Sequence, residues 1–155
     1  MIIGICVLTN TLKKIEGTVE FFQEEKEDVK IKVNISGLTP GKHGFHIHNK
    51  GDLTEGCKSL CSHYNPFNKV HGGLNSKEKH VGDLGNIIAD DNGIVKQIII
   101  GEDIELNGPI SVIGRSVIVH QDEDDLGLGG NEESLKTGNA GKRIACGVIG
   151  ISEEK

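Results

Sequence analysis

Six of the seven histidines in the chain fall in a pattern that suits metal binding. His46 and His48 are two residues apart, so in a strand their imidazoles point to the same face. Imidazole binds both copper and zinc, and three imidazoles with one carboxylate form a closed tetrahedral zinc set. The pattern therefore predicts a site for two metal ions. The remaining candidate ligands are His63, His71, His80, Asp83 and His120.

The segments that must position these ligands have the patterns of β-strands. In residues 29–35 apolar and polar side chains alternate, which is typical of a half-buried antiparallel strand. Asn92-Gly93 is a hairpin turn signal, and no segment predicts a convincing helix. We therefore expect one all-β domain over residues 1–155, a sandwich or barrel of about eight strands. The other strand candidates are residues 2–8, 15–22, 44–48, 83–89, 94–100, 116–120 and 144–151.

Two long segments, residues 49–80 and 121–142, show no sustained period. Loops beyond ~15 residues are uncommon in a compact domain unless they carry function or are disordered. The first segment holds three of the histidines, so a bound metal would fix its shape. The second contains a Gly127–Gly130 run, which is a poor phosphate cradle because no βαβ unit surrounds it.

Composition excludes several classes of protein. The chain has 155 residues, enough for one core, and only 3% aromatics, so Ile and Val must fill that core. A formal net charge of −6 argues against a nucleic-acid partner, and no apolar run approaches the ~20 residues of a membrane span. The apolar start, residues 1–8, lacks the basic flank of a signal peptide, so we expect a cytoplasmic protein.

The motifs resemble those of the copper,zinc superoxide dismutases, of the eukaryotic cytosolic type. Gly44–His48 is similar to the first signature of that family, and Gly138–Ile149 matches the second. Segments 71–73, 80–85 and 125–137 are similar too, so the resemblance covers essentially the whole chain. It implies a flattened eight-stranded Greek-key barrel with an immunoglobulin-like sandwich architecture, of which this family is a recognised example.

The resemblance also implies a role for each ligand. Copper would be held by His46, His48, His63 and His120. Zinc would be held by His63, His71, His80 and Asp83. His63 would then bridge the two metals as imidazolate, which spacing alone does not predict. Asp124 would accept hydrogen bonds from the outer nitrogens of one copper and one zinc histidine, fixing their tautomers.

The implied reaction is the dismutation of superoxide to oxygen and hydrogen peroxide, with one copper and one zinc ion per subunit. Because the substrate is an anion and the chain is acidic, a local positive field must guide it; such fields accelerate encounter ~10 to 1,000-fold, and this family is a standard example. Arg143 would contact the anion beside copper. Lys136, with Glu132 and Glu133, would guide it, and Thr137 would narrow the channel.

The four cysteines call for different interpretations. Cys6 lies in an apolar strand and reads as a buried free thiol. In a reducing compartment Cys57 and Cys146 would both be free, but the resemblance implies a disulfide between them. Cys61 is unusual for the family. It is either a chance surface residue, a competitor of Cys57 for Cys146, or a soft ligand during copper loading.

The resemblance implies a homodimer and a copper chaperone as partners. Many members of the family place an aromatic side chain at the position of Lys50 in the dimer contact. A lysine resists full burial, so we expect weaker association here. The rest of the expected interface is Gly51, Ile113, Gly114, Val148 and Ile151.

Two other functions compete with the dismutase. One is a copper-binding or copper-delivery module on the same barrel, with little dismutase activity; such relatives tend to lack copper ligands or the arginine. The other is a zinc-only hydrolase, which would need an open coordination position. Of the remaining polar residues, His43 is expected to form a hydrogen bond in the core, and Asp125 reads as a solvated acid.

Overall fold

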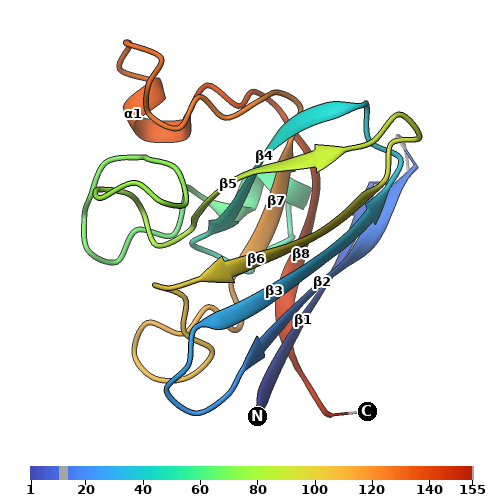
Figure 1. The fold of residues 1–155 in the computed structure, drawn as a ribbon, viewed down its shortest axis with the longest axis vertical. Coiled ribbons are helices and arrows are strands. Elements are labelled where there is room, and N and C mark those ends of the chain that lie inside the picture. Colours follow the sequence, from blue (N-terminus) through green and yellow to red (C-terminus); the bar gives the residue numbers. More distant parts are fainter. Residues whose placement is uncertain (11–13, 155) are drawn as a thin grey trace.

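A computed structural model describes residues 1–10 and 14–154 of the chain. Eight antiparallel strands form one sheet in the order β5-β4-β7-β8-β1-β2-β3-β6 and curl into a nearly closed barrel (Figure 1). The expected all-β class is confirmed. The strands are β1 Ile2–Asn10, β2 Ile15–Gln23, β3 Val29–Ser36, β4 Gly41–His48, β5 Asp83–Ala89, β6 Val95–Gly101, β7 Ser116–His120 and β8 Arg143–Ser152.

Alternation explains most of the strands. In β3, Val29, Ile31, Val33 and Ile35 are buried, while the lysines and asparagine between them are exposed. The barrel interior is filled mainly by aliphatic side chains, and Phe21 and Phe45 are its largest fully buried side chains. By contrast, β4 is buried on both faces from position 43 to its end, and β7 along its whole length. These two strands, which carry His46, His48 and His120, are therefore covered on both faces.

The barrel closes between its two edge strands through a side chain. Gln97 of β6 accepts a hydrogen bond from the backbone N–H of Ile88 at 3.1 Å. It also donates to the carbonyl of Asn86 at 3.3 Å. The amide of one glutamine thus joins β5 to β6 where the sheet order gives no backbone ladder.

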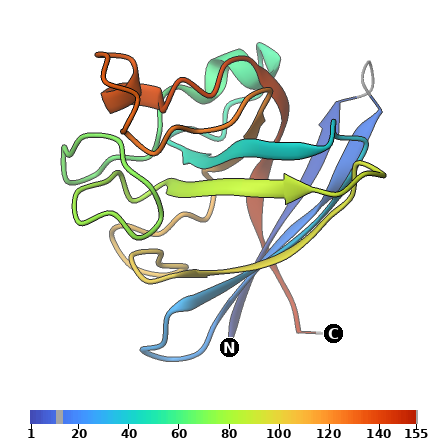
Figure 2. The same cartoon turned by 45° about the horizontal axis from the view of Figure 1, so that its top comes forward.

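The two long connections lie side by side at one end of the barrel (Figures 1 and 2). The β4–β5 connection contains a 3-10 turn, η1 Gly56–Leu60, and the β7–β8 connection contains a single α-helical turn, α1 Ser134–Thr137. The expectation of no helix was therefore wrong in detail, because single turns are too short to show a helical period. No helix in residues 1–10 and 14–154 is long and apolar enough to cross a membrane.

Candidate metal centre

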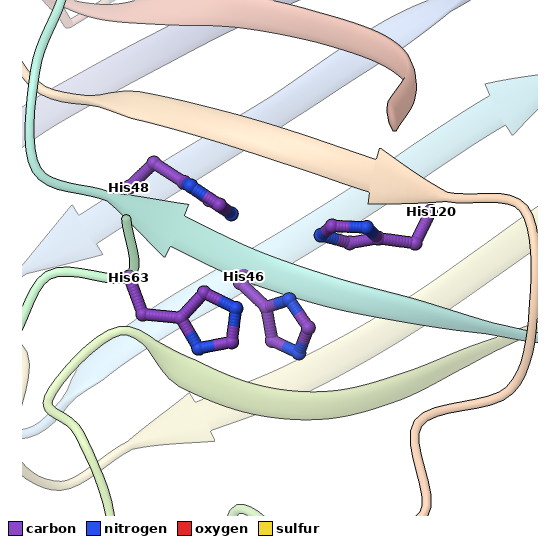
Figure 3. A group of neighbouring side chains, drawn as sticks. All are labelled: His46, His48, His63 and His120. Atoms are coloured by element: carbon purple, nitrogen blue, oxygen red, sulfur yellow. The ribbon is translucent and has the colours of Figure 1, made fainter. Parts of the chain in front are cut away.

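Strands β4 and β7 and the connection after η1 bring four imidazoles together (Figure 3). The pairing of β4 with β5 shifts register between Gly44 and His46, and β7 with β8 shifts at His120. Such bulges re-aim side chains next to active sites. An isolated bridge pairs His48 with His63 and ties the long connection to β4. The ring centroid of His46 lies 4.1 Å from that of His63 and 4.8 Å from that of His120.

The inward nitrogens of this first cluster converge without protein partners. Ligand atoms of its four histidines all lie within 4.8 Å of one another. Each histidine keeps one buried ring nitrogen that has no hydrogen-bond partner: His46 Nδ1, His48 Nε2, His63 Nε2 and His120 Nε2. Buried polar atoms are rarely left unpaired, so four such nitrogens facing one point fit a bound metal ion. Imidazole donors alone suit copper.

The outer nitrogens of the same rings are fixed. His48 Nδ1 donates to the carbonyl of Cys61 at 2.9 Å, and His120 Nδ1 donates to that of Gly141 at 3.1 Å. His46 Nε2 donates to Asp124 at 2.6 Å. A partner on the outer nitrogen fixes the tautomer and leaves the other nitrogen free to bind a metal. No sequence motif indicated the two backbone acceptors, because any residue type supplies a carbonyl.

A second cluster surrounds the carboxylate of Asp83. Its Oδ1 lies 2.9 Å from His63 Nδ1, 2.9 Å from His71 Nδ1 and 3.2 Å from His80 Nδ1. His71 Nδ1 faces this oxygen without the angles of a hydrogen bond. His46, His63, His71 and Asp83 form the tight geometric group, and His80 Nδ1 lies 3.2 Å from His63 Nδ1. Since His46 turns its Nε2 to Asp124, we assign His80 as the fourth member.

Burial sets the charges of these groups. Burial, with nearby His63, lowers the pKa of His46 and His48 well below its ordinary value. Those imidazoles are therefore neutral and able to act as ligands near neutral pH. Burial alone would raise the pKa of Asp83, but the adjacent imidazoles of His63, His71 and His80 hold it well below its usual range. The second cluster therefore has a carboxylate, which suits zinc.

Asp124 links the two clusters through the outer nitrogens of their histidines. Its carboxylate accepts from His46 Nε2 in the first cluster and from His71 Nε2, at 2.8 Å, in the second. Gly138, with φ of 73°, passes directly over this contact, and a Cβ there would meet both Asp124 Oδ1 and His71 Nε2. The glycine that opens the second signature therefore leaves room for the hydrogen bond between Asp124 and His71.

Asp125 organises the β7–β8 connection, so its interpretation as a solvated acid was wrong. Its Oδ1 accepts from the Ser134 hydroxyl at 2.7 Å and from the backbone N–H of Gly127. Its Oδ2 accepts from the Asn139 amide at 2.7 Å. Ser134 begins α1 and is fully buried. These contacts hold the turn that carries the predicted guidance residues, and an isolated acidic residue in a polar loop gives no signal of them.

A cavity of about 750 Å³ leads to the first cluster, and His48, His63 and His120 lie among its lining residues. Arg143 lines one side of it, and its guanidinium donates to the carbonyls of Cys57 at 2.7 Å and Cys61 at 2.5 Å. The predicted guidance residues Glu133, Lys136 and Thr137 also line it. Glu132 pairs with Lys136 at 2.9 Å, and the Thr137 hydroxyl donates to Glu133 at 2.9 Å.

The expected disulfide between Cys57 and Cys146 is confirmed. Leu60, Ile118 and Cys146 form a small buried cluster against Cys57, which anchors η1 on the barrel. Cys6 is free and buried, and Cys61 is free and exposed. Cys61 is therefore not paired with Cys146 in the structure.

Other predicted residues lie away from the two clusters. The ring of His43 is buried between the carbonyls of His120 and Thr39, each 2.8 Å away. Gly51 packs so closely on Gly114 and Val148 that a Cβ on it would meet the Gly114 carbonyl. Ile151 is 75% exposed. Three of the expected dimer residues, Gly51, Gly114 and Val148, therefore lie together. Lys50 is exposed and Ile113 is partly buried.

Comparison with known proteins decides the family. The family model described as copper/zinc superoxide dismutase (SODC) matches residues 15–149. The chain belongs to the copper/zinc superoxide dismutase family. As a superoxide dismutase it uses copper and zinc, and the two buried clusters are the sites consistent with those ions. The competing interpretations, a copper-delivery module and a zinc-only hydrolase, are set aside.

The relatives come from a virus and from nematodes. The superoxide dismutase (Cu-Zn) of Paramecium bursaria Chlorella virus 1 is 60% identical over 152 residues, 97% of this chain and 79% of the relative. The extracellular superoxide dismutase (Cu-Zn) of Onchocerca volvulus is 62% identical over 125 residues, 79% of this chain and 62% of the relative. That of Brugia pahangi is 50% identical over 152 residues, 96% of this chain and 76% of the relative.

Proposed function

We propose specific roles for the residues of this dismutase. His46, His48, His63 and His120 are the copper ligands, and His63, His71, His80 and Asp83 are the zinc ligands. The observation that carries the assignment is the set of four buried ring nitrogens without partners in the first cluster, beside the three imidazoles that surround Asp83 in the second. The position of His63 between the two clusters, with Nε2 on one side and Nδ1 2.9 Å from Asp83, supports its role as the bridge.

Copper at this position supplies the one-electron chemistry by which two superoxide anions and two protons become oxygen and hydrogen peroxide. His63 presents Nε2 to the cavity and carries a proton there in the second half of the cycle. Its Nδ1 lies 2.9 Å from Asp83 Oδ1, and these two atoms would hold zinc together and so keep the ring oriented. Asp124 holds one histidine of each cluster and sets the geometry between them.

Arg143 is proposed as the contact for the anion. An arginine stays charged at any working pH, and the two carbonyls that Arg143 binds fix its guanidinium in the cavity wall. Lys136 adds a second positive charge, reduced by its pairing with Glu132. Glu133 accepts a hydrogen bond from the Thr137 hydroxyl, and Thr137 narrows the entrance to the cavity.

Removal of Arg143 tests this role. We expect Arg143→Ala to bind both metals but to lose about tenfold or more in dismutation rate, with a weaker dependence on salt, because the local field is lost. Pulse radiolysis at several ionic strengths measures the dismutation rate and its dependence on salt. Lys142→Ala removes an exposed charge outside the cavity lining and is the matched control. An unchanged rate at low salt in Arg143→Ala would remove Arg143 from the mechanism.

A homodimer and a cytoplasmic location of the eukaryotic cytosolic type are also proposed. The close packing of Gly51 on Gly114 and Val148, together with the exposed side chain of Ile151, supports the dimer. The exposed free thiol of Cys61 supports a reducing compartment, although two relatives carry the word extracellular in their names. Cell fractionation with thiol labelling tests the location. Recovery in the medium, or Cys61 found oxidised in cells, would count against it.

A copper-delivering protein is the proposed loading partner. The four copper-side imidazoles are buried, while the thiol of Cys61, a soft ligand that suits copper(I), is exposed and close to Arg143 of the cavity. The copper content of the Cys61→Ser protein, purified from copper-limited cells, tests whether Cys61 takes part in copper loading. A copper content equal to that of the unchanged chain would exclude this role of Cys61.

A further inference from the structure

The cavity is much larger than a superoxide anion requires. Its volume is about 750 Å³, whereas one water molecule occupies ~30 Å³ in the liquid, and superoxide has only two atoms. Cavities of ~300–1,000 Å³ are the size that holds organic ligands. The site thus has room for a second kind of molecule.

Two apolar side chains lie on the rim of this cavity. Val70 and Leu135 line it and are 41% and 46% exposed. They belong to different connections, and the backbone N–H of His71, next to Val70, donates to the carbonyl of Leu135 at 2.9 Å. Figures 1 and 2 show α1 beside the β4–β5 connection at this point. Both side chains therefore line the cavity from adjacent segments, and we call this pair the apolar strip; a small inorganic anion does not need it.

Basic side chains line the same cavity as the strip. Lys69, Lys136 and Arg143 line the cavity, against one acidic side chain, Glu133. Lys136 is paired with Glu132, but Lys69 makes no salt bridge among the residues that the structure describes. The backbone of Lys69 is held by two hydrogen bonds to the Asn65 side chain, each 2.9 Å. Positive charge and apolar surface thus lie next to each other.

We propose that this cavity binds aliphatic monocarboxylates. The carboxylate lies among Lys69, Lys136 and Arg143, and the alkyl chain lies on Val70 and Leu135. Charge complementarity selects an anion, and the apolar strip selects one with a tail. A ligand there covers the approach to His63 and His120, so it inhibits dismutation in proportion to its occupancy. The proposal rests on the same cavity as the proposed function.

Titration calorimetry of the copper- and zinc-loaded protein at constant ionic strength tests the proposal, with acetate and octanoate as probes. Both carry the same headgroup, and octanoate has a longer tail. Each methylene moved from water onto apolar surface improves binding about fourfold. With part of the tail on half-exposed side chains, we expect octanoate to bind about tenfold more tightly than acetate. Equal affinities would overturn the proposal.

Substitutions locate the tail. Val70→Thr combined with Leu135→Gln keeps similar size but removes the apolar strip, and we expect the preference for octanoate to disappear. Leu128→Gln is the matched control, because Leu128 is an 83% exposed leucine of the same connection that does not line the cavity. It should keep the preference. Loss in Leu128→Gln, or retention in the double variant, would place the tail elsewhere and refute the site. Circular dichroism confirms that each variant is folded.

The carboxylate site and the dismutase mechanism are tested by independent measurements, so one can be refuted without the other. Superoxide consumption without carboxylate reports the catalytic roles of His63 and Arg143 alone. The difference in affinity between octanoate and acetate depends on the apolar strip alone. Nuclear magnetic resonance of the zinc-only protein measures the same binding without any turnover. Shifts confined to signals outside residues 69–70 and 135–136 would also contradict the site.

Discussion

At the scale of single residues, Asp124 has the widest influence on the metal sites, because it accepts from one histidine of each cluster. Asn in its place offers one oxygen and one NH2 group, so one of the two histidines loses its acceptor and changes tautomer. We expect Asp124→Asn to stay folded and to lose about 10–100-fold in zinc affinity. Chelator competition measures the loss. Asp122→Asn, a neighbouring exposed acid, is the control, and equal affinities in the two variants would contradict the role.

The histidines also make the metal-free protein sensitive to acid. Burial lowers the pKa of His120 to about 4, with His63 acting in the same direction. In the unfolded chain a histidine has a pKa of about 6.5 and binds its proton first, so stability is lost as pH falls from 6.5 toward 4. His71 acts oppositely: its pKa is raised to about 9 despite burial, by the neighbouring carboxylates of Asp124 and Asp83, so its contribution is lost as pH rises through that value.

Denaturant titrations of metal-free protein between pH 7 and pH 4.5 check this. We expect the free energy of unfolding to fall with pH, and to fall less steeply in His120→Gln, because that variant removes one of the groups that take up a proton on unfolding. The same slope in both proteins would show that His120 makes no contribution.

At this scale the sequence predicts the ligand types well but their partners poorly. Spacing alone indicates that His46 and His48 share a face, and the family resemblance supplies the division of ligands between two ions. The carbonyls of Cys61 and Gly141 that fix His48 and His120 are not predictable, because a backbone acceptor depends on how distant segments meet and not on residue type.

At the scale of elements, the disulfide fixes η1 against β8. The linked residues are 89 apart in sequence, and Cys57 also offers its carbonyl to Arg143. We expect Cys57→Ser with Cys146→Ser to lose about 2–4 kcal/mol of stability, the usual range for a native disulfide. The loosened turn should also weaken azide binding at Arg143. Thermal unfolding and azide titration measure the two effects; a stable variant with unchanged azide affinity would contradict both.

The strands were predictable and the turns were not. Alternating side chains gave β2 and β3 directly, and their ends agree within about two residues. β4 begins at Gly41, three residues before the expected Gly44, because pairing with β5 continues over residues without an alternating pattern. α1 and η1 arise from contacts such as that of Ser134 with Asp125, which no local period reveals.

At the scale of the whole molecule, the proposed dimer depends on a patch that includes one lysine. Lys50 is exposed beside Gly51, and a buried ammonium costs free energy that an aromatic side chain does not. We expect Lys50→Phe to tighten dimerisation about tenfold or more. Sedimentation of dilute protein measures the constant, with Lys58→Phe as an exposed control. No monomer in the unchanged chain at nanomolar concentration would contradict the predicted weakness.

The four unpartnered ring nitrogens of the first cluster have a consequence for the life of this protein in a cell. Each buried polar atom without a partner costs about 1–3 kcal/mol, and a bound ion removes that cost, so metal binding and folding are coupled. Proteolysis in cells follows the fraction of molecules that open. Copper and zinc supply should therefore set how long each molecule survives, and scarcity of either ion should lower the amount of enzyme as well as its activity.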